Sequence, residues 1–118
     1  MVNGYTMSKM PGTKKLTFEW DAANTAHIAR HYITPEEAEQ VVSGAALPLE
    51  SQERGGEERH TELGETVGGR LLVVVWTWRG RRIRVITAFP AHRKWRALWR
   101  RIQEEGTDAE EETGGHTH

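Results

Sequence analysis

Residues 71–87 read LLVVVWTWRGRRIRVIT, two runs of β-branched and aromatic residues separated by Gly80 and Arg81. Runs of this composition favour strands, and a two-residue connection that begins with glycine favours a type II′ turn. We therefore predict a β-hairpin with strands at 71–78 and 83–87, and the other expectations about the fold are built around this hairpin.

The two-residue turn also predicts which hairpin residues lie opposite each other. The expected pairs are Arg79 with Arg82, Trp78 with Ile83, Thr77 with Arg84, Trp76 with Val85 and Val75 with Ile86. Because side chains alternate between the faces of a strand, Thr77 and three arginines share one face. Their guanidinium groups repel one another unless an anion lies among them. Phosphate, the carboxylates of a partner, or Glu57 and Glu58 of this chain would satisfy them.

A capping signal before the hairpin predicts a helix. Thr34 followed by Pro35 and Glu37 forms a capping box, which begins a helix at 35–43 that Gly44 closes. This boundary is the clearest one in the sequence, because three residue types agree on the same starting point.

Weaker signals place the remaining elements of the first half. Asp21 can cap an earlier helix over 22–31, and alternation of apolar and polar residues predicts strands at 16–20 and 59–65. Weak strand signals precede residues 51–56, which we expect to form a polar loop.

Pro90 is expected to open a C-terminal helix. Apolar residues recur after it at helical spacing and predict one face that packs on the sheet, while the basic side chains point outward. The residues of this face are Ala91, Trp95, Leu98, Trp99 and Ile102.

Charge is strongly segregated along the chain. Residues 70–103 carry ten Lys or Arg and no Asp or Glu, whereas residues 16–69 carry eleven acidic and three basic residues. The net charge of −1 is therefore unevenly distributed, and we predict a basic face. Tryptophans interleave with these cations, and such a surface suits a polyanion with stackable bases. A solvated basic helix beside an arginine-rich hairpin, without a ligand, is the alternative.

Length and composition predict one domain. The 118 residues divide into an expected flexible leader at 1–15, a single domain at 16–103 and a disordered acidic tail at 104–118. The chain lacks cysteine, which excludes disulfides and thiolate metal sites. No segment reads as a signal peptide or a membrane span, so we expect a cytoplasmic protein.

A metal site is not predicted. His27 and His31 lie one helical turn apart, as in zinc sites, but no glutamate follows the first histidine and no third ligand accompanies them.

Six segments of the chain form an ordered set of motifs. They are Phe18 to His31 with Glu19, Trp20, Asp21, Asn24 and His27; Thr34 to Ala38; Glu57 to Gly64; Gly69 to Val75; Thr77 to Gly80; and Arg82 to Ala88. Together they resemble the BrnT family of toxins over roughly residues 16–102.

The resemblance implies an α+β, RelE-like fold, in which two N-terminal helices and one C-terminal helix pack on a small antiparallel sheet. It also implies a toxin of a type II toxin–antitoxin system, a metal-independent endoribonuclease without cofactors that cleaves RNA to arrest translation. RNA and a DNA-binding, BrnA-like antitoxin are the implied partners, and homo-oligomerisation stays open. Such cleavage needs no metal, because the RNA 2′-hydroxyl can attack its neighbouring phosphate.

Carried over to this sequence, the resemblance implies five catalytic residues. Arg59, Arg79 and Arg84 would stabilise the charge on the phosphate. His31 would act as acid or base because histidine exchanges protons near neutral pH, and Glu58 would act as base or orient Arg59. Further RNA contacts are expected from Arg70, Trp78, Arg82, Arg93, Lys94, Arg96 and Arg100. The alternative role of His31 is to end the first helix, and Glu58 and Arg59 could be ordinary strand residues.

The sequence departs from the family at three positions. Phe89 stands where the family has an arginine, and Trp95 and Trp99 stand where it has glutamate and tyrosine. The loss of one charge-stabilising donor costs about 2.7 to 4 kcal/mol of transition-state stabilisation. The alternative function is therefore a non-catalytic module on the same scaffold that binds nucleic acid or a protein partner.

Overall fold

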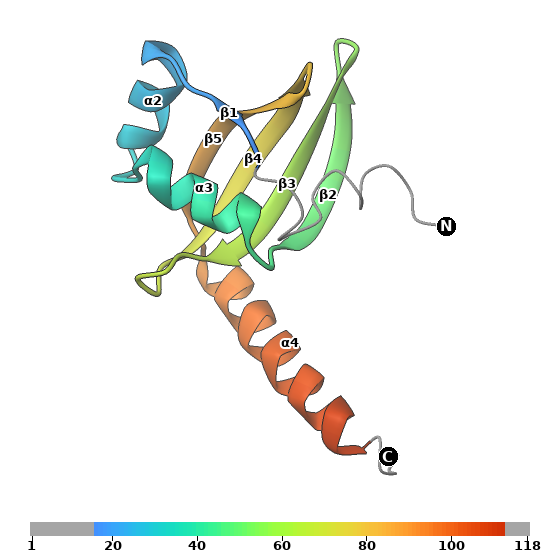
Figure 1. Ribbon diagram of the computed structural model, residues 1–118. Helices are drawn as coiled ribbons and strands as arrows, with labels where there is room; N and C mark the ends of the chain where they lie inside the picture. Colours follow the sequence, from blue (N-terminus) through green and yellow to red (C-terminus); the bar gives the residue numbers. More distant parts are fainter. Residues whose placement is uncertain (1–15, 113–118) are drawn as a thin grey trace.

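The computed structural model describes residues 16–112, with side chains through Glu105, and over this range the chain forms an α+β domain (Figure 1). The elements are β1 (Phe18–Glu19), α2 (Ala22–Ala29), α3 (Pro35–Ser43), β2 (Leu47–Arg54), β3 (Glu57–Glu65), β4 (Leu71–Arg79), β5 (Arg82–Pro90) and α4 (Arg93–Glu112). The strands form one mixed sheet in the order β1-β5-β4-β3-β2, in which only β1 pairs in parallel among the described strands. The predicted fold class is confirmed.

The β4–β5 hairpin has the predicted turn. Gly80 begins it with a φ of 65°, as the first position of a type II′ turn requires. The predicted register holds for four pairs, from Arg79 opposite Arg82 to Trp76 opposite Val85.

The fifth predicted pair is wrong because a β-bulge interrupts β5. Val75 lies opposite Thr87, and Ile86 is the extra residue on the bulged strand. A bulge restarts the alternation one residue later, so Thr87 and Phe89 share a face with Arg84.

Both N-terminal helices begin at their predicted caps. Asp21 Oδ1 accepts a hydrogen bond from Asn24 N at 3.1 Å, and Asn24 Oδ1 accepts one from Asp21 N at 2.8 Å. Thr34 and Glu37 form the same reciprocal pair at the start of α3. These boundaries were predictable because a capping box lies within four consecutive residues.

Helix α2 ends at Ala29, before the predicted end at His31. Tyr32 follows in a left-handed conformation with a φ of 62°, and its side chain is 86% exposed. Its carbonyl oxygen accepts a hydrogen bond of 2.9 Å from Arg70 Nη1, which connects this turn to the beginning of β4. The helix therefore stops where the chain must reverse to enter α3.

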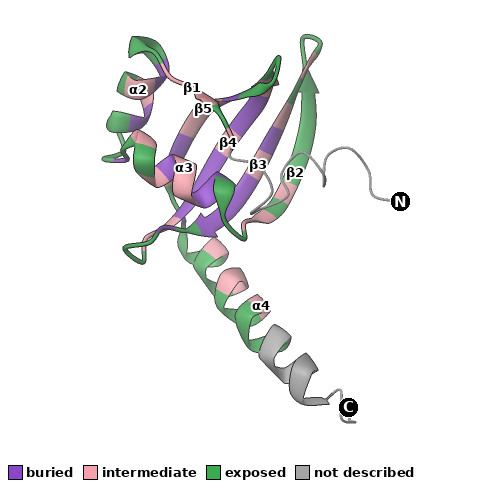
Figure 2. Cartoon of the chain, in the orientation of Figure 1, coloured by how far each residue is buried: buried purple, intermediate pink, exposed green. Residues whose placement is uncertain are grey.

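Helices α2 and α3 cover one face of the sheet, and the main core lies between these two layers (Figures 1 and 2). Trp76 is the largest fully buried side chain. It belongs to a cluster with Ile28, Ile33, Ala38, Val41, Val42, Leu72, Val74, Ile83, Val85 and Ala88. Residues of the predicted strand at 16–20 pack against this cluster, although β1 itself is shorter than predicted.

The C-terminal helix contacts the opposite face and then leaves the sheet (Figure 1). Trp95 and Trp99 pack against a smaller cluster that contains Leu63 and Val73. Pro90 was predicted to open this helix, and that prediction is wrong. Pro90 instead ends β5, where it lies opposite Leu72. The helix continues to Glu112, past the predicted domain end at residue 103.

The predicted loop at residues 51–56 is wrong. Strand β2 continues to Arg54, and Gly55 and Gly56 make the turn with φ values of 57° and 82°, both positive as in a type I′ turn. The second half of β2 lies at the sheet edge and is exposed, so it lacks the alternation that betrays a half-buried strand.

The predicted leader at 1–15 and residues 113–118 lie outside the described residues. Across the part of the chain that is described, no helix combines the length and apolar character needed to cross a bilayer.

Candidate functional site

Four arginines gather on the sheet face opposite α2 and α3. Arg59 on β3 is the register partner of Thr77 on β4, which is the partner of Arg84 on β5. Arg79 and Arg82 form the next row, toward the hairpin turn. We call Arg59, Arg79, Arg82 and Arg84 the arginine strip. The hairpin prediction placed three of these side chains together correctly, because the register near the turn is as predicted.

Glu57 lies between two arginines of the strip. Its Oε2 accepts hydrogen bonds from Arg79 Nη2 at 3.1 Å and Nε at 3.3 Å. Its Oε1 lies 3.4 Å from Arg59 Nη2. The hydrogen bond from Arg79 is the main cause of a lowered pKa of the Glu57 carboxyl group. Glu57 therefore neutralises one end of the strip.

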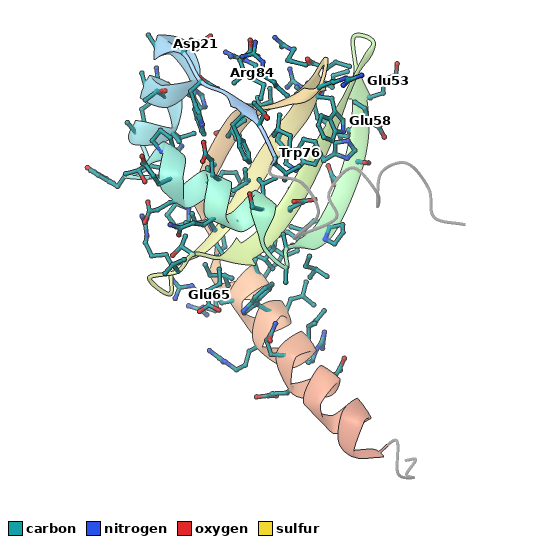
Figure 3. The ribbon with its side chains drawn as sticks, in the orientation of Figure 1. Asp21, Glu53, Glu58, Glu65, Trp76 and Arg84 are labelled. Atoms are coloured by element: carbon teal, nitrogen blue, oxygen red, sulfur yellow. The ribbon has the colours of Figure 1, made fainter. Side chains whose placement is uncertain are left out.

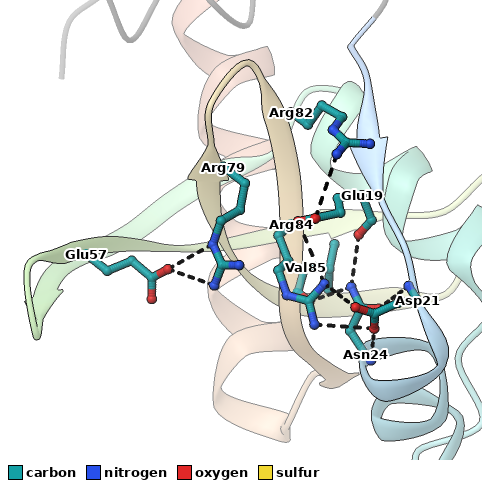
Figure 4. Close-up of polar contacts among 8 residues, drawn as sticks. All are labelled: Glu19, Asp21, Asn24, Glu57, Arg79, Arg82, Arg84 and Val85. Atoms are coloured by element: carbon teal, nitrogen blue, oxygen red, sulfur yellow. Dashed lines mark hydrogen bonds and ion pairs between the residues drawn. The ribbon is translucent and has the colours of Figure 1, made fainter.

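Arg84 is held by acidic residues at the edge of the sheet (Figure 4). Its Nη1 lies 3.0 Å from Asp21 Oδ2 and 3.8 Å from Glu19 Oε1, and Arg82 Nη2 lies 3.8 Å from Glu19 Oε2. The hydrogen bond from Arg84 lowers the pKa of Asp21. With a side chain 15% exposed, Arg84 is the least accessible cation among the ion pairs of the described residues.

The strip is thus neutralised by carboxylates of its own chain, one of the alternatives that the sequence left open. The distances of 3.0 to 3.8 Å mark ordinary ion pairs on a partly exposed surface. Exposed ion pairs contribute little net stability, so a phosphate that bonds two guanidinium groups can compete with them.

Glu58 does not take the predicted place beside Arg59. Adjacent residues of a strand point to opposite faces, and the exposed Glu58 side chain lies near the β2–β3 turn, away from the strip (Figure 3). Its carbonyl oxygen accepts a hydrogen bond of 2.8 Å from Thr77 Oγ1. Glu57, two residues before Arg59 on the same face, makes the contact that was expected of Glu58.

Trp78 also lies away from the strip. It packs against the main core on the helix-covered face, and its ring meets that of Trp76 edge to face with centroids 5.3 Å apart. The predicted RNA contact from Trp78 would therefore not be made on the face that carries the arginine strip.

His31 lies at the other end of β5 from Arg84. Its ring is 6.3 Å from that of Phe89, and Phe89 stacks on His92 with centroids 6.0 Å apart. We call His31, Phe89 and His92 the histidine cluster. Phe89 follows Arg84 by five positions on β5, which corresponds to about 15 Å along a strand. The structure thus divides the predicted catalytic residues between two places.

Other predicted RNA contacts surround the beginning of α4. Arg70 Nη1 donates to Glu37 Oε1 at 2.9 Å, and Arg96 Nε donates to the Ala91 carbonyl oxygen at 3.3 Å. Lys94 Nζ lies 5.0 Å from the centre of the Trp95 ring. A groove of about 520 Å³ between the β3–β4 turn and α4 is lined by Arg70, Arg96, Trp99 and Arg100 among others. Arg93, Lys94 and Arg100 are exposed.

No cluster of three or more histidine, cysteine or acidic residues suited to a metal ion occurs within residues 16–105. The chemistry available from the described side chains is the binding of anions by guanidinium groups and the transfer of protons by exposed imidazoles.

Sequence reasoning named Glu57 among the possible partners of the arginines but missed His92, Glu19 and Asp21. The place of Glu57 follows from the strand, because residues at i and i+2 share a face. His92 and Asp21 gave no local signal, since their neighbours come from segments distant in sequence, such as Arg84 63 residues from Asp21.

Comparison with known proteins identifies a family. Residues 20–94 match the family model described as the ribonuclease toxin BrnT of type II toxin–antitoxin systems. The matched range includes α2, α3, β2 to β5, the arginine strip and the histidine cluster. No curated protein matches the chain. Since the family model covers more than half of the sequence, the chain belongs to the BrnT family of ribonuclease toxins.

Proposed function

We propose that this protein is a metal-independent endoribonuclease that cleaves RNA and arrests translation until an antitoxin binds it. Membership of the BrnT family supports the toxin and ribonuclease parts of this proposal. The arginine strip supports RNA as the ligand, because four guanidinium groups on one open face match the charge and geometry of a phosphodiester backbone.

The strip would act on the phosphate rather than on the proton. Guanidinium groups stay protonated and donate hydrogen bonds in a fixed geometry, so they would hold phosphates of the RNA backbone that flank the cleaved bond. Arg79 and Arg84 are the main candidates, with Arg59 between β2 and β4 as a third donor. When RNA binds, its phosphate oxygens would replace the carboxylates of Glu57 and Asp21 as partners of the guanidinium groups.

Proton transfer would take place at the other end of β5. His31 is the predicted acid or base, and the distance of about 15 Å between Arg84 and Phe89 lets one extended RNA strand contact both regions. The exposed cations Arg93, Lys94 and Arg100 of α4 lie beyond the histidine cluster in the chain and would bind neighbouring phosphates.

The test is cleavage of a synthetic RNA by the purified protein in the presence of a metal chelator. We expect the wild-type protein to cut, and Arg84→Ala and Arg79→Ala to cut at least about 10-fold more slowly because the RNA is bound and positioned less well. Arg81→Ala is the matched control, because Arg81 is an exposed turn residue outside the strip. Cleavage that needs added metal would contradict the proposal.

The consequence for cells needs a separate experiment. Induction of the wild-type gene without a partner should stop growth and protein synthesis, and Arg84→Ala should not. Co-expression of a BrnA-like, DNA-binding antitoxin should restore growth and yield a stable complex. Both results assume a cytoplasmic protein that meets cellular RNA, which is part of the same proposal.

A second candidate function is a non-catalytic module that binds RNA or a protein partner. Phe89 favours it, because a half-buried aromatic ring stands in the histidine cluster where the family has an arginine. A protein that binds RNA in a salt-dependent way and cuts only after Phe89→Arg would identify this module.

A further inference from the structure

A second imidazole lies beside the predicted acid or base. His31 comes from the turn after α2, and His92 comes from the connection between β5 and α4. Both side chains are exposed, and both rings contact Phe89, one edge to face and the other stacked at 28°. Two proton-carrying groups from distant segments therefore meet around one aromatic ring.

We propose that His92 is the second proton-transfer residue of this ribonuclease and works together with His31. This inference rests on the proposed function, because it assigns a residue to the same cleavage reaction. Transfer of an RNA phosphoryl group to its own 2′-hydroxyl needs one base and one acid. The resemblance named His31 as acid or base and Glu58 as a base, but Glu58 lies near the β2–β3 turn, apart from the histidine cluster.

The chemical step balances with these two residues alone. One neutral imidazole takes the proton of the 2′-hydroxyl while its oxygen forms a bond to phosphorus. The bond from phosphorus to the 5′ oxygen breaks, and the other imidazole, initially protonated, gives its proton to that oxygen. The products are a 2′,3′-cyclic phosphate and a 5′-hydroxyl, and neither metal nor oxidant takes part.

The two imidazoles lie close enough to act on one phosphodiester. Centroid separations of 6.3 and 6.0 Å to Phe89 limit the two imidazoles to a separation of at most about 12 Å. An attacking and a leaving oxygen on opposite sides of phosphorus can each come within hydrogen-bond reach of one ring at such a separation.

The backbone of His92 is fixed in this position. Its carbonyl oxygen accepts hydrogen bonds of 3.0 Å from the amides of both Trp95 and Arg96, so His92 directly precedes α4 and is bonded to its first turn. His31 is also fixed, because its amide donates to the Ile28 carbonyl oxygen at 2.9 Å. On the His31 side, Arg70 donates to the carbonyl oxygen of Tyr32 and is paired with Glu37, which holds the turn that carries His31.

The test uses variants that keep the ring and remove the proton. His92→Phe and His31→Phe preserve an aromatic contact with Phe89, so a purely structural role predicts normal cleavage. We expect each variant to cut a chelator-treated RNA at least about 100-fold more slowly in single-turnover assays, because general acid or base catalysis contributes at least that factor. Circular dichroism and thermal melts monitor the fold of each variant.

A second substrate separates the two roles. RNA with sulfur in place of the bridging 5′ oxygen has a leaving group that needs no proton, so it should restore the rate of the variant that lacks the acid and of that variant alone. If the wild-type protein cleaves RNA and His92→Phe cleaves it at the same rate, the assignment of His92 is wrong. The assignment is also wrong if the sulfur-containing substrate restores the rate of neither variant. No cleavage by the wild-type protein would overturn the proposed function and the assignment with it.

Discussion

Arg84 Nη1 lies 3.0 Å from Asp21 Oδ2, so an arginine of the predicted active face holds the residue that caps helix α2. Asp21 keeps its second role at the same time, because its Oδ1 accepts the hydrogen bond from Asn24 N. Asn24 in turn donates to the Val85 carbonyl oxygen at 3.1 Å. The arginine strip and the packing of α2 on β5 are therefore coupled through one carboxylate.

These ion pairs predict a loss of stability in acid. Arg84 lowers the pKa of Asp21 from its usual 3.8, and Arg79 lowers the pKa of Glu57 from its usual 4.5. Because the fold favours the ionised carboxylates, their contribution is complete above these usual values and is lost as the pH falls through the lowered ones. We expect the midpoint of thermal unfolding to fall between about pH 5 and pH 3.

Glu57→Gln should show a smaller fall over the same range, since glutamine does not titrate. Glu53→Gln is the control, because it removes an exposed glutamate of β2 without touching the strip. Identical pH profiles for the two variants would show that Glu57 contributes nothing specific.

The carboxylates also predict how tightly RNA binds. Glu57 occupies the guanidinium groups of Arg79 and Arg59, and a phosphate must displace it. Glu57→Gln should therefore tighten binding of a non-cleavable, 2′-methylated RNA by roughly 3- to 5-fold, the modest gain expected when an exposed ion pair no longer competes. Fluorescence anisotropy at two salt concentrations measures this change.

A general effect of net charge has to be separated from release of the arginines. Glu53→Gln changes the net charge equally on the neighbouring strand, and we expect it to alter the affinity by less than Glu57→Gln. An equal gain from both variants would mean that Glu57 does not compete with RNA for the strip.

The left-handed backbone conformation of Tyr32 predicts that its replacement by glycine stabilises the protein. Its φ of 62° lies in the left-handed region, and its side chain is 86% exposed, so little packing is lost when it is removed. The left-handed conformation costs an L-residue about 1 to 2 kcal/mol, whereas glycine adopts it freely but loses more chain entropy on folding. Tyr32→Gly should raise the free energy of unfolding by about 0.5 to 1 kcal/mol.

Tyr32→Ala separates backbone strain from loss of the ring. Alanine removes the same exposed side chain but keeps the unfavourable φ, so we expect no gain from it in urea unfolding. A gain of equal size in both variants would show that the tyrosine ring, and not its backbone, was destabilising.

The structural features that could be predicted from the sequence are those that depend on neighbouring residues of the chain. The turn at Gly80 and the capping box of Thr34 and Glu37 lie within a few residues, so their physics is complete in a short segment. The second half of strand β2 was not predicted because its exposed edge carries no apolar alternation. The bulge at Ile86 was not predicted because it lies inside an apolar run.

The candidate site was predictable only in part for the same reason. The arginine strip follows from hairpin register, whereas its neutralisation by Asp21 depends on a contact across 63 residues. The histidine cluster depends on where the chain turns after α2 and after β5, and the sequence contains no periodic signal for either turn.

The contact between α3 and β3 predicts a strong effect from the smallest possible substitution. A Cβ atom on Gly64 would lie 2.9 Å from Val41 Cγ1, closer than carbon atoms approach without displacement, and Val41 is itself fully buried in the main core. Gly64→Ala should therefore destabilise the protein by about 1 to 3 kcal/mol, measured by urea unfolding.

Val41→Ala also destabilises by leaving a cavity, but it removes the methyl group that the new Cβ would meet. The double variant should then be more stable than the sum of the two single effects predicts, by at least about 0.5 kcal/mol. Strict additivity would show that Gly64 is required by its backbone rather than by the close approach of α3 to β3.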